Sequence, residues 1–255
     1  MKPVSVPALI AALCLTNAVA SAGDDEDHAD ANDPSQAVHE LFLTESVFPN
    51  QQGEYQPFVA ADYQRHSRDS WNTLLTVGVE YGITDRLQVS TSIPWVSIHD
   101  EGERRDGAGD LSSELFYNLI PTSEPVALSF AAGITLPTGK EDRGFGEGEE
   151  EIELTMILAG RAADVQWQFN LGGEWTDDES EFVYSVAVLP MQSHSTIVLT
   201  LELSGAETDE GSELYATPGL HWRPAENAGL GFGVPVGLSS DAQHRRVMMY
   251  YTIEF

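Results

Sequence analysis

Cysteine is almost absent from this sequence, and positive charge is scarce. The one cysteine, Cys14, falls in an N-terminal leader, so the mature chain has no disulfide and no thiol chemistry. The formal net charge is −29, and Lys140 is the only lysine outside the leader. Nucleic-acid binding depends on neutralising phosphates, so this acidity argues against a nucleic-acid partner. Two explanations of the acidity stay open, namely a salt-rich habitat and a functional preference for cations.

Long apolar runs and catalytic motifs are also lacking. Outside the leader there is no run of about 18 apolar residues, which excludes membrane-spanning helices. The sequence has no G-x-S-x-G nucleophile motif and no H-E-x-x-H metal motif. The glycine-rich GLGFG at 229–233 lies in a strand pattern with no helix after it, so it is not a nucleotide-binding loop. We therefore expect no enzymatic activity, no metal and no cofactor.

The N-terminal residues divide into three segments before the first long strand pattern. Residues 1–22 are typical of a secretory signal peptide, with Lys2, an apolar stretch over 8–15 and a small-residue cleavage site at 20–22. Residues 23–40 are acidic and poor in apolar groups, which predicts a disordered tail. Residues 41–53 show a short apolar alternation of their own, and we expect either a plug or a partial strand there.

The stretch from Trp71 to Trp95 predicts a β-hairpin with one apolar and one polar face. Apolar residues recur at every second position over 71–81 and again over 87–95, with a tight connection between. Tyr81 lies near the turn, and we expect Trp71 and Trp95 to lie together at the far end, about ten residues away, which is the length of a tilted membrane-crossing strand. Aromatic residues at both edges of an apolar band are typical of transmembrane barrels.

About twelve segments of this kind fill residues 54–255. Because hydrocarbon offers no partner to an unpaired strand edge, the sheet must close on itself. The pattern predicts an all-β fold, a transmembrane antiparallel up-and-down β-barrel of about 12 strands. A soluble barrel or sandwich with an apolar core would show the same alternation, but the leader and the end-placed aromatics favour the membrane barrel. The aromatic residues expected at the membrane interface are Trp71, Tyr81, Trp95, Tyr117, Trp175, Trp222 and Phe255.

The connections alternate between tight and long. Short turns face the periplasm and long loops face outward in such barrels. We expect the outer loops at 100–109, 138–150, 176–180 and 206–212, the second of which is either solvated or folded inward.

The polar face of each strand would line the lumen. Its carboxylates either favour cations at a constriction or pair with Arg246 and face water. Bulky members such as Phe116 and Tyr250 favour a narrow, partly apolar passage, whereas Gly231 and Gly233 leave room for a solute or a plug. The residues expected to line the lumen are Asp62, Glu80, Asp110, Glu114, Phe116, Glu153, Glu174, Glu202, Tyr215, His221, Arg246 and Tyr250.

Three stretches carry a family resemblance: VEYGITDRLQVSTSIPW (79–95), GAGDLSSELFYNLI (107–120) and GITLPTGKEDRGFG (133–146). Together they resemble the bacterial outer-membrane transporter family named after the meta-pathway of phenol degradation. The resemblance implies a small outer-membrane barrel that moves aromatic or hydrophobic compounds. The final YTIEF resembles the C-terminal strand that the outer-membrane assembly machinery recognises.

These observations together predict an exported protein of the bacterial outer membrane that acts as a passive channel. Its expected partners are outer-membrane lipid, the assembly machinery and a small-molecule solute. The alternative is a non-conducting structural or adhesive barrel whose lumen is filled by side chains and by residues 41–52.

Overall fold

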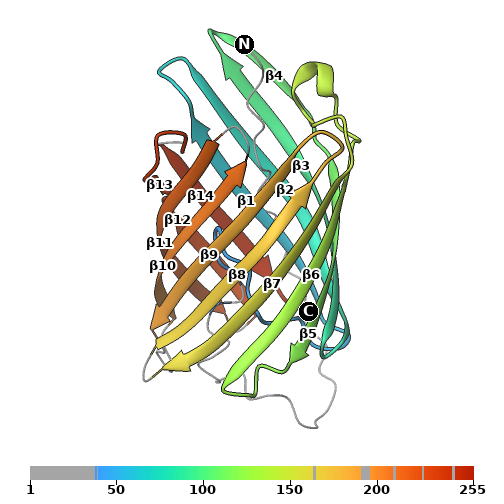
Figure 1. Ribbon diagram of the computed structural model, residues 1–255, viewed down its shortest axis with the longest axis vertical. Coiled ribbons are helices and arrows are strands. Elements are labelled where there is room, and N and C mark those ends of the chain that lie inside the picture. Colours follow the sequence, from blue (N-terminus) through green and yellow to red (C-terminus); the bar gives the residue numbers. More distant parts are fainter. Residues whose placement is uncertain are drawn as a thin grey trace.

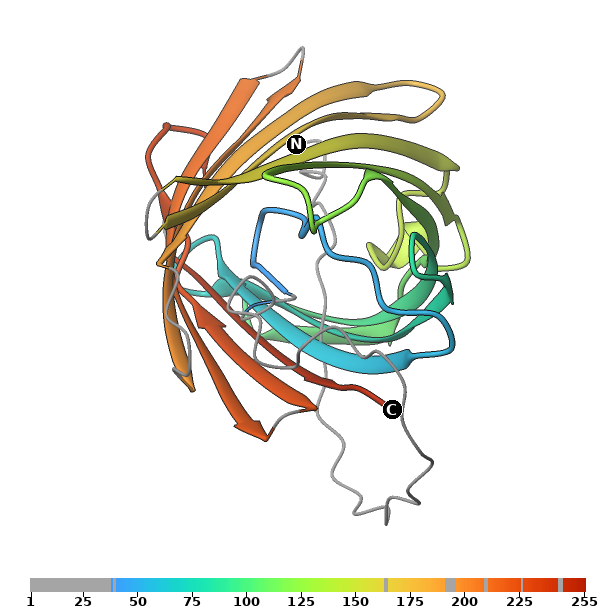
Figure 2. The ribbon, with the colours of Figure 1, turned by 90° about the horizontal axis from the view of Figure 1, so that it is seen from below.

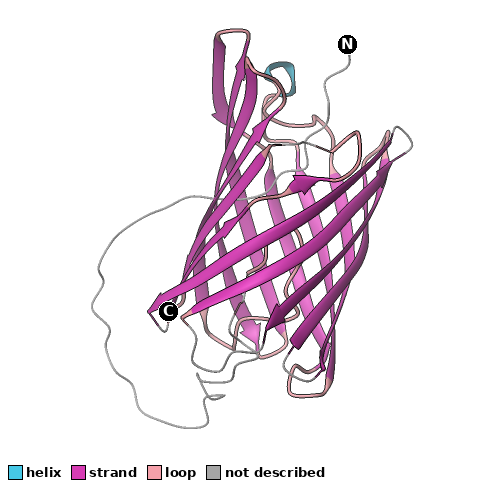
Figure 3. Cartoon of the chain, turned by 90° about the vertical axis from the view of Figure 1, so that its left-hand side faces the viewer, coloured by secondary structure: helices cyan, strands magenta, loops and turns pink. Residues whose placement is uncertain are grey.

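The chain forms one closed sheet of tilted antiparallel strands (Figures 1 and 3). The computed structural model describes residues 38, 40–162, 165–190, 196–208, 211–225, 227–242 and 245–255. The expected signal peptide and residues 23–37 lie outside this part. The strands are β1 (Tyr55–Arg65), β2 (Ser70–Thr84), β3 (Leu87–Asp100), β4 (Glu103–Ala108), β5 (Leu111–Ile120), β6 (Val126–Leu136), β7 (Glu151–Ala162), β8 (Val165–Trp175), β9 (Ser180–Pro190), β10 (Ile197–Thr208), β11 (Gly211–Ala225), β12 (Ala228–Gly233), β13 (Val236–Gly237) and β14 (Arg246–Ile253), with one 3₁₀ turn, η2 (Glu141–Arg143).

The fourteen strands of the described chain make twelve barrel strands. β4 and β5 both pair with β3 and are separated by Gly109 and Asp110, so they are one interrupted strand. β12 and β13 both pair with β11 and are separated by Val234 and Pro235, where proline removes a backbone donor. The ring closes because β1 pairs with both β2 and β14. The prediction of an all-β antiparallel barrel of about 12 strands is confirmed.

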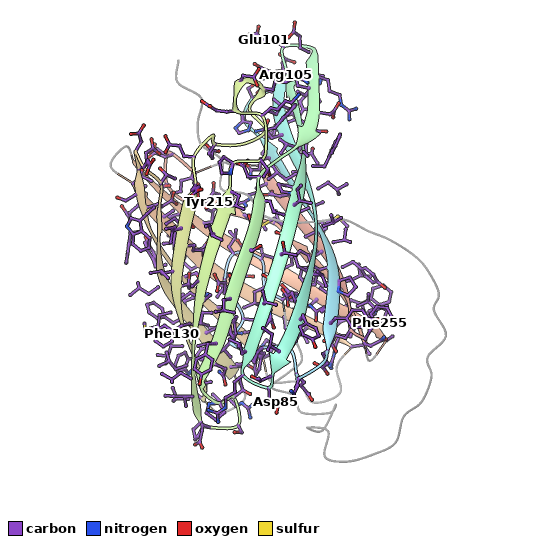
Figure 4. The ribbon with its side chains drawn as sticks, turned by 90° about the vertical axis from the view of Figure 1, so that its right-hand side faces the viewer. Asp85, Glu101, Arg105, Phe130, Tyr215 and Phe255 are labelled. Carbon is purple, nitrogen blue, oxygen red and sulfur yellow. The ribbon has the colours of Figure 1, made fainter. Side chains whose placement is uncertain are left out.

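Side chains alternate between the two faces of the wall along most of each strand. Along β2, Leu75, Val77 and Val79 are exposed, whereas Leu74 and Thr76 between them are buried. Phe130 of β6 points away from the barrel in Figure 4 and is 43% exposed. The outer face is thus apolar and the inner face largely polar, the inverse of a soluble β-barrel. No helix in the part of the chain that the structure describes is long and apolar enough to cross a membrane.

Two of the expected outer loops are instead strand. Residues 100–109 form a hairpin in which β3 and β4 pair from Asp100 with Glu103 onward. Its turn residues Glu101 and Gly102 have φ of 49° and 90°, the left-handed values that a tight hairpin turn requires. Apolar alternation does not predict this strand, because most of the residues of β4 are charged. Likewise β10 and β11 remain paired up to Thr208 and Gly211, so 206–212 is not a long loop.

The closing seam between β1 and β14 carries a buried ion pair. Arg246 Nη2 donates to Asp62 Oδ2 at 2.7 Å, and Nε lies 3.0 Å and 3.1 Å from the two carboxylate oxygens. Gln64 Nε2 donates to the same carboxylate at 2.8 Å. The side chains of Asp62 and Arg246 are 0% and 5% exposed, respectively. The first and last strands are therefore joined by charge as well as by backbone bonds.

We expect Arg246→Met to destabilise the barrel by about 3–5 kcal/mol, because it leaves the Asp62 carboxylate buried without a counterion. The measurement is the urea midpoint of unfolding for the refolded chain in detergent micelles. The double variant Asp62→Leu/Arg246→Met removes both charges and should recover most of the loss. Equal midpoints for the single and double variants would contradict this account.

Candidate functional site

Residues 40–53, called the plug below, run through the interior of the barrel. Figure 2 looks along the barrel and shows this blue segment inside the ring of strands. The plug contains no strand or helix. Its side chains Phe42 and Val47 are 2% and 0% exposed, so they are enclosed by the wall. The backbone of the plug must therefore find its hydrogen-bond partners among wall side chains.

Glu202 of β10 holds the start of the plug. Its Oε1 accepts the backbone N–H of Phe42 at 2.9 Å, and its Oε2 accepts that of Leu43 at 2.7 Å. The Glu202 side chain is fully buried. A carboxylate that receives two backbone donors forms charge-assisted bonds, which are stronger than neutral ones.

Amide side chains hold the middle and the end of the plug. Gln168 Oε1 accepts the Val47 N–H at 2.8 Å, and Gln88 Oε1 accepts the Asn50 N–H at 2.7 Å. Asn170 Nδ2 donates to the carbonyl of Glu45 at 3.2 Å. These contacts come from β3 and β8, and the Glu202 contacts come from β10, so the plug is attached to well-separated parts of the wall.

Apolar packing joins the plug to the wall at the level of Val47. The buried cluster there includes Phe116 and Ile157, and Phe48 packs against it. A second buried cluster joins Val38 and Leu41 to Leu189 and neighbouring residues of β9 and β10. Phe116 therefore contacts the plug instead of lining an open passage.

We expect Glu202→Gln to loosen the plug, because an amide accepts only one of the two backbone donors well. Each lost bond to a charged acceptor costs about 1.5–3 kcal/mol, so the Phe42 and Leu43 amides should exchange with solvent roughly tenfold to a hundredfold faster. Amide hydrogen exchange on the refolded barrel measures this directly. Glu181→Gln, which changes an inner carboxylate of β9, is the matched control. Unchanged protection in Glu202→Gln would show that Glu202 does not hold the plug.

A row of carboxylates crosses the inner wall obliquely. Consecutive barrel strands place them directly opposite one another, with Glu153 facing Glu174 and Glu174 facing Glu181. Like charges at opposing positions repel, so this row favours either bound cations or shared protons. The full row of opposing positions is Glu80, Ser90, Glu114, Gly133, Glu153, Glu174 and Glu181.

Glu40, at the start of the plug, lies close to this acidic wall. Burial raises the pKa of its carboxyl from 4.5 to about 7; the Gln56 amide, which donates to it at 3.2 Å, lowers the pKa, and the carboxylates of Glu114 and Glu254 raise it. The docked plug therefore favours the neutral form of Glu40. Since the pKa is raised in the docked state, docking is strongest below about pH 4.5 and weakens as the pH rises through about 7.

A spin label at Ser46→Cys should report this pH dependence, because residues 23–255 contain no other cysteine. We expect label mobility to increase between about pH 5 and about pH 8, on either side of the raised pKa. Glu40→Gln, which stays neutral, should reduce the increase. A pH response of the same size in Glu40→Gln would assign the effect to other groups.

Asp110 has a structural role at the barrel rim that carries the β3–β4 hairpin. Its two carboxylate oxygens accept the backbone N–H groups of Gly139 at 2.7 Å and Glu147 at 2.9 Å. Phe145 of the same loop is 4% exposed and lies against Gly107 of β4, where a side chain would collide with its ring. Arg105, labelled in Figure 4, donates to the carbonyl of Arg143 at 3.3 Å. The loop 137–150 is thus folded inward against the β3–β4 hairpin.

The other residues expected in the lumen also lie on the inner face, in two groups. Tyr215, labelled in Figure 4, lies under the Arg246 guanidinium, 5.6 Å from its ring centroid, and donates to Glu213 at 3.0 Å. His221 and Tyr250 lie beside Phe42 of the plug. The anchoring amides Gln88, Gln168 and Asn170 escaped the sequence analysis, although their recurrence at inner positions was the available signal.

The expected interface aromatics lie on the outside. Tyr81, Trp95, Tyr117, Trp175 and Trp222 are all at least 43% exposed. Their position relative to a membrane stays a prediction. Trp71 stacks on His99, with ring centroids 3.8 Å apart, and at the opposite end of the barrel Phe255 stacks on Tyr55 at 5.1 Å. Trp95 pairs with Leu75 instead, so the expectation that Trp71 and Trp95 lie together is wrong.

Within the described residues, no group of three or more histidine, aspartate or glutamate side chains is placed to hold a metal ion.

The fold and the site together define a twelve-strand barrel of the transmembrane type with an internal plug. No family model and no curated protein matches the chain. Among solved structures, the KdgM porin in complex with disordered oligogalacturonate matches with a TM-score of 0.52 at 8% identity, over 77% of this chain and 98% of that one. The CymD monoaromatic hydrocarbon channel and the translocator domain of the autotransporter NalP from Neisseria meningitidis both have a TM-score of 0.47, at 11% and 10% identity, and both matches cover 81% of this chain and 89% of theirs. At these identities the likeness concerns the barrel fold and does not extend to what is transported.

Proposed function

We propose that this protein is an outer-membrane channel for small molecules, held closed by its own plug. The observation that carries the proposal is that every barrel strand pairs with wall neighbours on both sides, whereas the plug from Phe42 to Asn50 is held by wall side chains, and its end, Gly53, donates its backbone N–H to the Gly82 carbonyl at 2.8 Å. The ring is therefore complete without the plug. Moving the plug would expose a tunnel whose inner wall is rich in amides, hydroxyls and carboxylates.

The outer face supports a location in the outer membrane. Its exposed apolar side chains form a belt that suits lipid acyl chains, with aromatic residues toward both edges. β14 leads into the exposed Phe255, as the resemblance to strands recognised by the assembly machinery requires. Export by the N-terminal leader belongs to the same proposal.

Two features of the inner wall bear on the solute. Phe58, Leu74 and Tyr250 place apolar surface on the inner face, which suits aromatic or hydrophobic compounds and agrees with the phenol-degradation family resemblance. The carboxylate row favours cations over anions. We propose passive uptake of small aromatic molecules, with cations preferred where the solute is charged.

A second function, a non-conducting structural barrel, is favoured by the packing around Val47. Both Val47 and Ile157 are 0% exposed, so the plug and the wall pack against each other without solvent access at these two residues. The two functions differ in what happens when the plug is removed.

We expect plug replacement to open the channel. In this variant, residues 41–49 are replaced by a glycine–serine sequence of the same length. The replacement removes the apolar plug side chains that pack against the wall, and the flexible glycine-rich chain loses more conformational entropy when its backbone docks. Single barrels in planar lipid bilayers should then change from mostly closed to steadily conducting. In a salt gradient the reversal potential should show cation preference, and Glu153→Gln/Glu174→Gln in the same background should reduce it.

The matched control replaces the exposed outer loop 176–179 with glycine and serine and should leave the barrel closed. Unfolding midpoints of all variants establish that the ring is intact. A correctly folded plug replacement that carries no current would favour the structural barrel and overturn the channel.

A further inference from the structure

The ring of Phe42 fills a pocket whose floor is made of two glycines. Gly219 of β11 and Gly233 of β12 face each other in register. A methyl group on Gly219 would lie 2.6 Å from Phe42 Cε2, and one on Gly233 would lie 2.7 Å from Phe42 Cγ. Even an alanine at either position would therefore collide with the ring. The wall has room for a flat six-membered ring here because both positions lack a side chain.

Two aromatic side chains form the sides of this pocket. The ring centroid of Phe42 lies 5.0 Å from that of His221 and 5.6 Å from that of Tyr250, with interplanar angles of 33° and 43°. Gly231 allows Tyr250 to lie close to the wall, since a side chain there would meet its ring. Rings at this distance in tilted orientations attract one another beyond the effect of buried area. The pocket therefore suits an aromatic ring better than an aliphatic one.

Hydrogen bonds fix these two rings in place. Tyr250 donates its hydroxyl proton to the carbonyl of Glu40 at 3.0 Å. Because a tyrosine hydroxyl has one proton, His221 Nδ1 donates to Tyr250 at 2.6 Å, and Thr200 donates to His221 Nε2 at 2.8 Å. His221 is thus held by the wall on both sides, independently of Phe42.

A buried hydroxyl lies next to the pocket. Thr217 is the next inner residue along β11 from Gly219 and is 0% exposed. Its Oγ1 has no hydrogen-bond partner among the described residues. Buried polar groups without partners are costly, so a ring that carries a hydroxyl group would gain from binding beside Thr217.

We propose that this pocket is a binding site for a small monocyclic aromatic solute of the phenol type, which displaces Phe42 and so releases the plug. The inference rests on the proposed channel and adds its ligand site and its means of opening. Phe42 acts as a tethered competitor, and tethered groups have effective concentrations of about millimolar. The solute therefore acts at about millimolar concentrations. Release of the Phe42 side chain also weakens the hydrogen bonds from the Phe42 and Leu43 backbone N–H groups to Glu202, because these groups lie on the same short stretch of backbone.

The test records single full-length barrels in planar bilayers with phenol, and with cyclohexanol as the non-aromatic match. A ligand at about ten times its Kd that binds only the undocked state shifts the equilibrium about tenfold. We expect this rise in the open fraction with phenol and a much smaller one with cyclohexanol. An equal rise with both would overturn the aromatic site, since it would reflect a general effect on lipid or barrel.

Three variants locate the effect. Phe42→Ala removes the competitor, so the channel should open without solute and bind phenol more tightly. Gly233→Val fills the pocket, so the channel should open without solute and ignore phenol. Val47→Ala is the matched control: it loosens the plug elsewhere, so the basal open fraction should rise while the response to phenol persists.

Binding is measured separately by the fluorine NMR linewidth of 4-fluorophenol with the refolded chain in micelles. We expect the 4-fluorophenol signal to broaden more with Phe42→Ala than with Gly233→Val. The Gly233→Val sample serves as the reference, since its broadening reports only partition into the micelle. If the plug replacement conducts but Phe42→Ala and Gly233→Val broaden the signal equally, the pocket assignment is wrong and the channel stands. If the plug replacement is silent, the channel itself fails, and this inference fails with it.

Discussion

The pairing of β1 with β14 is the constraint on which the rest of the structure depends. A sheet that exposes its outer face to hydrocarbon has no solvent to satisfy a free edge, so the ring must close completely. Closure uses seven paired positions and the buried ion pair between Asp62 and Arg246. Every strand then has its backbone partners within the ring, so the strands need no further partner from the interior. The inner side chains can therefore be polar, and a polar inner wall is what a lumen for solutes requires.

The polar inner wall in turn explains how a segment without secondary structure can be held inside. The plug brings backbone donors and carbonyls into the barrel, and each unpaired group would be costly there. Glu202, Gln168 and Gln88 supply acceptors at the positions where the plug has donors. The attachment consists of discrete bonds together with two apolar clusters. Such an attachment can be released without opening the ring.

Period-two alternation was enough to predict the barrel and its strand number. It also predicts the face on which Leu75 or Thr76 lies, because the face of each side chain follows directly from its place in a strand. The β3–β4 hairpin was missed because Arg104 and Arg105 carry charge where the pattern looked for apolar residues. The contacts of Asp110 with Gly139 and Glu147 depend on a loop whose path no local pattern encodes. The same holds for Phe42 and Gly233, which lie 191 positions apart and meet only after closure. The wall therefore follows from a local pattern, whereas the contents of the lumen depend on contacts between residues that are far apart in the sequence.

The glycines of β11 and β12 connect the wall to the plug. Glycine within a strand weakens it, since it adds backbone freedom and packs no side chain. This destabilising effect is present where two rings pack against the wall, Phe42 from the plug and Tyr250 from β14. The glycines at that place are Gly219, Gly231 and Gly233. Larger wall residues can fill a lumen permanently, as Ile157 does where it packs against Val47. Beside Phe42 the wall has glycines instead, and the space that larger wall side chains would fill is occupied by a ring from the plug, which lies outside the sheet. An occupant of that kind can be exchanged for another ring of the same shape, whereas a wall side chain cannot, and this difference is the physical basis for regarding the pocket as a site.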